Sequence, residues 1–124
     1  MKGIDGETFE SAYARITVLV SNECKRFANL QESQVVLDAD KKIFNSLIEQ
    51  NATEANLQDS LSVLMRMLCT YYGKQVILLI DEYDVPLDKA NSKGFYNEMV
   101  DFLRGFFGGA FKTDPNLYFA VVTG

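Results

Sequence analysis

The sequence of 124 residues contains no histidine. This absence excludes Ser–His and Cys–His nucleophile pairs, histidine-bearing zinc sites and imidazole general bases within these residues. Cysteine is scarce as well, because the chain has two, Cys24 and Cys69, which lie far apart. Each falls within an apolar helical pattern, which is typical of buried free thiols in a reducing compartment. Any chemistry in this sequence must therefore come from carboxylates, hydroxyls, amines and the backbone.

Long apolar runs and clusters of basic residues are also missing. No run reaches the roughly 18 to 20 residues needed to span a bilayer, and the opening "MKGIDGETFE" has no apolar signal-peptide core. The net charge is −5 and the 12 basic residues are scattered, so a phosphate-contacting surface for nucleic acid is not supported. The sequence therefore predicts a soluble, cytoplasmic protein with no membrane partner.

The first part of the chain, residues 1–73, has the apolar spacing of helices. Apolar residues recur at steps of three and four along residues 7–31, from about 41 to 50, and from about 55 to 72. Asp38 or Asp40 is a suitable N-cap for the second of these segments, and Gly73 is a suitable residue to end the third. Residues 1–73 are therefore expected to form a helical region.

The second part, residues 74–124, has the pattern strand, helix, strand. The run "QVILLI" (75–80) is apolar without alternation, which is typical of a strand covered on both faces in a parallel sheet. A loop containing Pro86 is expected next, then a helix from a cap at Ser92 to about Gly108. The run "LYFAVV" (117–122) predicts a second strand, so the segment reads as a right-handed βαβ unit.

Acidic residues follow the first predicted strand directly, in "QVILLIDEYDVPL". Four aliphatic residues followed by Asp81 and Glu82 form the Walker B pattern, and open α/β sheets bind ligands beyond the carboxyl ends of their strands. Asp81 can orient Mg²⁺ through a water, and Glu82 can act as the base for an attacking water. Thr123, after the second strand, can position the same water. The alternative is a solvated loop after a core strand, with Thr123 an ordinary strand-to-turn residue.

The segment "LIDEYDVPLDKANSKGFYNEMVDFLRGFFGGAFKTDPNLYFAVVTG" resembles the AAA-ATPase-like family of uncharacterised bacterial proteins. The family pattern LIDEYD-x-P is matched from Asp81 to Pro86, and its later positions by Phe102, Leu103, Arg104, Lys112, Thr123 and Gly124. The preceding "LQDSLSVLMRMLCTYYGKQ" is similar to the helix that the family places before Walker B. The resemblance covers residues 57–124 and, more loosely, residues 1–56.

The resemblance implies an ATPase whose full-length form uses Mg²⁺ and ATP. Family members begin with a phosphate loop of the type RPRRFGKS and often carry a PD-(D/E)XK nuclease-like domain, but this sequence has no G-x-x-x-x-G-K-[ST]. The expected fold is α/β, with a partial P-loop NTPase-like parallel sheet (strands about 75–80 and 117–122) and a helical N-terminal half. We expect one partial domain over residues 1–124, a fragment running from Walker B to the sensor strand.

Without the phosphate loop, no backbone N–H groups or lysine would hold the β- and γ-phosphates. We therefore expect this chain alone not to bind or hydrolyse ATP. Its expected partners are the missing phosphate-loop segment and a second copy paired through an exposed strand edge, with nucleic acid suggested only by analogy to the family. Two other functions stay open: a noncatalytic interaction module on an ATPase-derived scaffold, and a Mg²⁺-dependent phosphotransfer or hydrolase domain.

Overall fold

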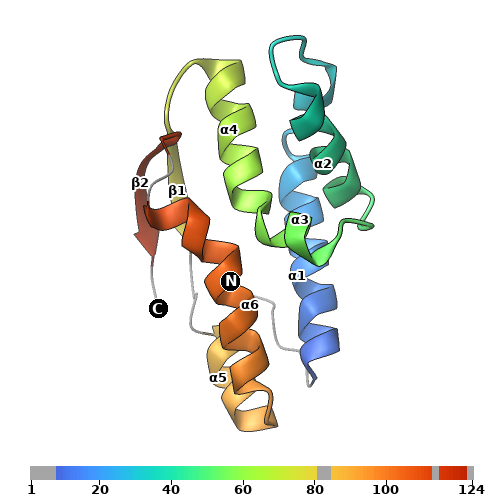
Figure 1. The fold of residues 1–124 in the computed structure, drawn as a ribbon, viewed down its shortest axis with the longest axis vertical. Coiled ribbons are helices and arrows are strands. Elements are labelled where there is room, and N and C mark those ends of the chain that lie inside the picture. The colour runs from blue at the N-terminus through green and yellow to red at the C-terminus, as the bar shows by residue number, and fades with distance from the viewer. Residues whose placement is uncertain (1–7, 81–84, 113–114, 123–124) are drawn as a thin grey trace.

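The computed structural model describes residues 8–80, 85–112 and 115–122, most of which lie in helices (Figure 1). In chain order the elements are α1 (Phe9–Lys25), the 3₁₀ helix η1 (Ala28–Glu32), α2 (Asp38–Ile48), α3 (Glu54–Gln58), α4 (Ser60–Tyr72), β1 (Val76–Ile80), α5 (Val85–Lys93), α6 (Tyr96–Lys112) and β2 (Leu117–Val122). Among these helices, none combines the length and apolar character needed to cross a membrane.

Local sequence signals set several helix ends. The Thr8 hydroxyl accepts a hydrogen bond from the Ser11 N–H at 3.1 Å, and the Thr8 N–H donates to Ser11 Oγ at 3.1 Å, which closes a capping box before α1. Gly73 has φ 71° at the end of α4, as predicted, because a residue without Cβ adopts the left-handed conformation at low cost. The single helix expected over residues 7–31 is instead α1 followed by η1.

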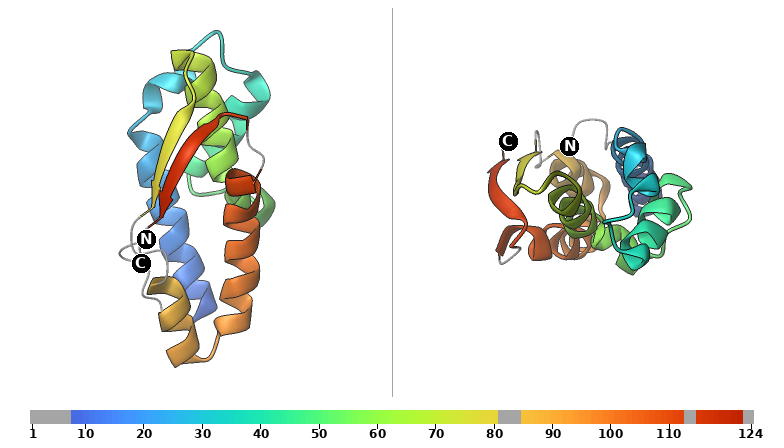
Figure 2. Two further views of the ribbon diagram at one scale, coloured as in Figure 1. Left: turned by 90° about the vertical axis from the view of Figure 1, so that its left-hand side faces the viewer. Right: turned by 90° about the horizontal axis from the view of Figure 1, so that it is seen from above.

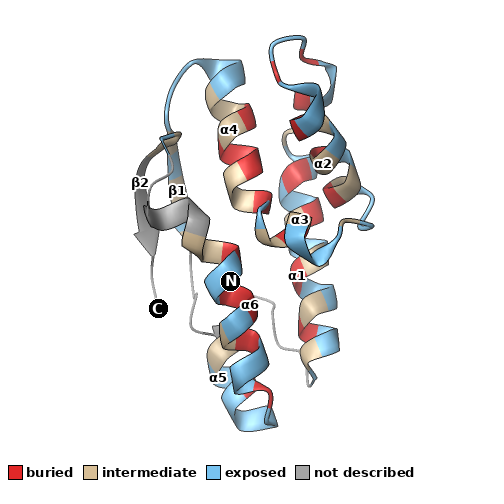
Figure 3. Ribbon diagram, in the orientation of Figure 1, coloured by how far each residue is buried: buried red, intermediate tan, exposed pale blue. Residues whose placement is uncertain are grey.

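The core lies between the helices, whose buried positions face one another (Figure 3). α2 packs against both α1 and α4, and α6 packs against α3, α4 and α5. An aromatic cluster joins the beginning of α1 to α6: the Phe102 ring lies 6.2 Å from the Phe9 ring and 5.5 Å from the Tyr13 ring, in edge-to-face contacts. These contacts connect the helical first half of the chain to the second half.

A partly buried ion pair also joins α2 to α4. The Arg66 guanidinium donates from Nε to Asp40 Oδ2 at 2.8 Å and from Nη2 to Asp40 Oδ1 at 2.7 Å. The prediction that Asp40 or Asp38 is the N-cap of α2 is wrong, because Leu37 occupies that position and both aspartates lie in the first turn. Asp40 instead bonds to a residue 26 positions away in the sequence.

β1 and β2 pair in parallel, with Leu78 opposite Ala120 and Ile80 opposite Val122 (Figure 2). The prediction of an α/β fold with a partial P-loop NTPase-like parallel sheet is wrong. The described residues are mainly helical, and the strands described in them are these two alone. The apolar run at 75–80 predicted burial on both faces, whereas alternate residues of β1 are exposed: Ile77 is 52% and Leu79 is 72% exposed. A strand with one bare face is not the interior strand of a doubly covered parallel sheet.

The segment after β1 also differs from the prediction. The loop expected around Pro86 includes helix α5, with Pro86 fully buried in its first turn. Proline fits there because its missing N–H would have no partner within the helix. The next helix begins at Tyr96 and not at a Ser92 cap, since Gly94 has φ 90° and separates α5 from α6.

Candidate functional site

The carboxyl ends of the two strands lie next to each other. Ile80 and Val122, the last residues of β1 and β2, are paired. In the sequence, Asp81 follows Ile80 and Thr123 follows Val122. The predicted site residues Asp81, Glu82 and Thr123 themselves lie outside the described residues. The structure therefore places Ile80 and Val122 side by side. The roles predicted for Asp81, Glu82 and Thr123 stay predictions.

The opposite ends of the strands are fixed by two hydrogen bonds. The Val76 N–H donates to the Asn116 carbonyl oxygen at 2.7 Å. The Gln75 side chain donates from Nε2 to the Pro115 carbonyl oxygen at 2.9 Å. These bonds hold the beginnings of the strands together, where Val76 lies opposite Leu117; the register then shifts between Val76 and Ile77, and from Ile77 onward it leads to Ile80 opposite Val122.

No group of three or more histidine, cysteine, aspartate or glutamate side chains able to hold a metal ion occurs in the part of the chain that the structure describes. Two of the described acids form ion pairs with arginines. Asp40 binds Arg66 between α2 and α4, and Glu23 binds Arg26 within one turn at the end of α1.

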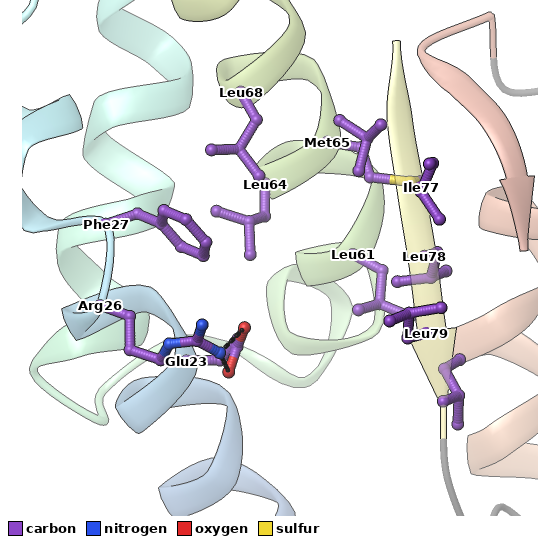
Figure 4. Close-up of a pocket in the computed structure, with 12 residues that line it drawn as sticks. Glu23, Arg26, Phe27, Leu61, Leu64, Met65, Leu68, Ile77, Leu78 and Leu79 are labelled. Carbon is purple, nitrogen blue, oxygen red and sulfur yellow. Dashed lines mark hydrogen bonds and ion pairs between the residues drawn. The ribbon is translucent and has the colours of Figure 1, made fainter. Parts of the chain in front are cut away.

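A second feature, which the sequence reasoning missed, is an apolar groove over α4 between β1 and the end of α1 (Figure 4). We call it the α4 groove; it has a volume of about 450 Å³. Its floor is formed by Leu61, Leu64 and Leu68 of α4, and β1 forms one wall. Leu61 and Leu68, which are half-buried, belong to the apolar stripe expected for this helix, and that stripe alone does not distinguish a groove from core packing.

The far wall of the α4 groove carries its polar groups. Arg26 Nη1 donates to Glu23 Oε1 at 2.9 Å and to Oε2 at 3.0 Å, and the guanidinium lies 5.6 Å from the centre of the Phe27 ring. The charges of Glu23 and Arg26 offset each other, so this wall presents an ion pair of no net charge. The groove therefore suits an apolar, uncharged group.

Burial sets the acidity of two side chains of α1, Tyr13 and Cys24. Burial raises the pKa of the Cys24 thiol to about 12, and the nearby Glu23 carboxylate adds to the rise. Burial also raises the pKa of Tyr13, again with a smaller contribution from a carboxylate, that of Glu54. Both groups are therefore held in their neutral forms at ordinary pH, and Cys24 is a poor nucleophile.

We expect iodoacetamide at pH 8 to modify Cys69 and to leave Cys24 unmodified in the folded chain. With a pKa of about 12, roughly 10⁻⁴ of the Cys24 thiol is ionised at that pH, and the residue is buried. Peptide mass spectrometry should find one modified site, and two after unfolding in urea. A Cys69→Ser variant is the control and should remain unmodified while folded. Rapid alkylation of Cys24 in that folded variant would contradict this prediction.

A sequence model of the family described as predicted AAA-ATPase matches residues 2–124, nearly the whole chain. No curated protein and no solved structure matches the chain. The resemblance seen in "LIDEYDVP" and the following residues is thereby confirmed at the level of the family. The chain belongs to the predicted AAA-ATPase family.

Proposed function

We propose that this chain carries the acidic part of a nucleotide-hydrolysing site. In this proposal Asp81 orients Mg²⁺, Glu82 activates the attacking water, and Thr123 positions that water. The carrying observation is the pairing of Ile80 with Val122, because each predicted site residue follows one of these strand ends in the sequence. Membership of the predicted AAA-ATPase family over residues 2–124 supports the same assignment.

The chemistry of these side chains fits such a role. The backbone of a paired strand is held in place, so a carboxylate that directly follows it is well suited to hold Mg²⁺ through a water. A second carboxylate one residue later can accept the proton of the attacking water. When bound together with a nucleotide, Mg²⁺ would neutralise part of the negative charge of the phosphates. Cytoplasmic ATP with Mg²⁺ is thus the cofactor class that we propose for a protein containing this segment.

The phosphate-holding part of the site is proposed to come from residues outside these 124. A single carboxylate binds Mg²⁺ weakly, because this ion is held mainly by waters and substrate phosphates. The sequence has no G-x-x-x-x-G-K-[ST] loop, whose backbone N–H groups and lysine would hold those phosphates. A phosphate-loop segment is therefore the partner that this site requires.

We expect Mn²⁺, used as a paramagnetic substitute for Mg²⁺, to bind this chain weakly and next to the strand ends. In NMR spectra, about 1 mM Mn²⁺ should broaden the amide signals of Ile80 and Val122 most strongly, since weak carboxylate sites bind in the millimolar range. The Asp81→Asn variant should lose most of this broadening. The Asp88→Asn variant, which removes the same charge from an exposed position on α5, should keep it.

Calorimetry with Mg·ATP completes the test. The expected result is no stoichiometric heat, because the phosphates have no binding loop in these residues. Equal broadening in the Asp81→Asn and Asp88→Asn variants would contradict the proposed role of Asp81. A stoichiometric heat that Asp81→Asn abolishes would show instead that the chain binds the nucleotide without a partner segment.

A further inference from the structure

The helices α3 and α4 are separated by a bend at a single residue, Asp59. This residue has φ −86° and ψ −1°, and Figure 1 shows α3 turned away from the axis of α4. The two angles differ from those of a regular α-helix by about 20° and about 40°. Residues 55–72 also have the apolar spacing of one continuous helix. A small rotation at Asp59 would therefore join the two helices into one.

The beginning of α4 is buried without the hydrogen bonds that a helix end normally has. No side chain caps it, and its first backbone bond runs from the Val63 N–H to the Asp59 carbonyl oxygen at 2.9 Å. The N–H groups of Ser60, Leu61 and Ser62 therefore lack partners within α4. Ser60 is 2% exposed, and its hydroxyl has no hydrogen-bond partner among the described residues. Buried polar groups without partners are costly, so the bend is unfavourable at this point.

A single straight helix over residues 54–72 would supply the missing partners. In an α-helix each N–H donates to the carbonyl oxygen four residues earlier, so the first N–H groups of α4 would bond to residues of α3. The Ser60 hydroxyl would reach the Asn56 carbonyl oxygen, which also lies four residues earlier. Local hydrogen bonding therefore favours the straight form, and contacts from outside these two helices must hold the bend.

The helix that makes such contacts is α6. The Gln58 side chain donates from Nε2 to the Phe102 carbonyl oxygen at 3.2 Å. Gly105, one turn later on α6, leaves the space that this side chain occupies, because a Cβ atom at position 105 would lie 2.7 Å from Gln58 Cδ, closer than Cβ contacts allow. The missing side chain of Gly105 thus lets Gln58 reach the backbone of α6 and hold α3 there.

We propose that Asp59 is a hinge and that α6 holds it bent through Gln58. When α6 moves away from α3, the Gln58 bond breaks and residues 54–72 become one straight helix. The hinge responds to the position of α6, which residues 113–116 connect to β2. Any link between the hinge and hydrolysis rests on the proposed function, because Thr123 follows β2, but the hinge itself does not.

The Gly105→Ala variant tests the hinge. The added methyl group displaces the flexible end of Gln58 from Phe102, while alanine suits a helix better than glycine. In the parent chain, residual dipolar couplings of the backbone amides should fit separate axes for α3 and α4, and the amides of residues 60–62 should exchange faster than those of residues 63–68. In Gly105→Ala, residues 54–72 should fit one axis, and the amides of residues 60–62 should exchange at least about tenfold more slowly than in the parent.

Two further variants complete the comparison. Gly108→Ala is the matched control, since it makes the same change on the same helix where an added Cβ meets no atom within 4 Å, and it should keep two axes. Gln58→Ala removes the contact from the other side and should straighten the hinge as Gly105→Ala does. Circular dichroism checks that each variant keeps the helical content of the parent chain.

Three results would overturn this inference. Two axes and unchanged amide exchange in both Gly105→Ala and Gln58→Ala would show that α6 does not hold the bend through Gln58. Equal straightening in Gly108→Ala would show that the helix propensity of α6 is responsible, and not the contact with Gln58. A single axis in the parent chain would show that there is no bend to release. These measurements use neither metal nor nucleotide, so their failure would be distinct from a failure of the proposed function.

Discussion

Replacing Arg66 with alanine is expected to lower the free energy of unfolding by about 2 to 3 kcal/mol. The Asp40 side chain is 6% exposed, and both of its oxygens accept hydrogen bonds from the Arg66 guanidinium. The variant leaves this carboxylate buried without its cation, and the cost of an unpaired buried charge exceeds the net gain of the pair. Arg66 itself is 42% exposed, so solvent can partly replace it and the loss stays below that of a fully buried pair. Urea unfolding followed by circular dichroism measures the change.

The Arg26–Glu23 pair provides the matched control. It also joins an arginine to a carboxylate, that of a glutamate, at a similar distance of 2.9 Å, but its side chains are 69% and 49% exposed. Arg26→Ala should therefore change the stability by less than about 0.5 kcal/mol. Arg66→Lys should lie between the two variants, because lysine keeps the charge but loses the two parallel N–H donors. If Arg66→Ala and Arg26→Ala had equal effects, burial of Asp40 would not be what makes the first pair important.

The ion pair also shows where sequence reasoning reaches its limit. The end of α4 at Gly73 was predicted correctly because it depends on neighbours within one turn, whereas the single helix predicted from about residue 55 to 72 is divided into α3 and α4. The partner of Asp40 could not be predicted, because Arg66 lies 26 residues away and meets it only when α2 packs on α4. The N-cap prediction assumed that the aspartate bonds to the backbone at the start of its own helix. In the structure, Asp40 bonds to Arg66 of another helix instead.

In the strand region, too, the sequence predicts the local element but not the tertiary packing around it. An apolar run without alternation predicts a strand, but it does not reveal which faces other elements cover, and Ile77 and Leu79 are exposed. Pro86 was interpreted as a chain breaker, although proline also suits the first turn of a helix such as α5. The acids of the predicted site come from one continuous motif, and their role stays a prediction. The α4 groove could not be found in this way, because it depends on how α1, α4 and β1 lie together in space.

Replacing Phe102 with alanine is expected to have the larger effect, a loss of about 3 to 4 kcal/mol in the free energy of unfolding. Phe102 is buried, and its ring contacts Phe9 and Tyr13 of α1 as well as Phe106 on its own helix. Truncation removes both the apolar contact area and the edge-to-face ring contacts, and it leaves a cavity between α1 and α6. Chemical unfolding followed by circular dichroism again measures the change.

Two variants separate the loss of this cluster from a general weakening of α6. Tyr96→Ala truncates an aromatic side chain at the exposed start of the same helix and should cost less than about 0.5 kcal/mol. Phe102→Leu keeps most of the buried volume and should cost about 1.5 kcal/mol. Because Phe102 joins α1 to the helix that leads into β2, the Phe102→Ala variant should still unfold in one transition if residues 1–124 form one domain. Two separate transitions would mean that the first helices and the strand pair fold independently, and that this cluster is the contact that couples them.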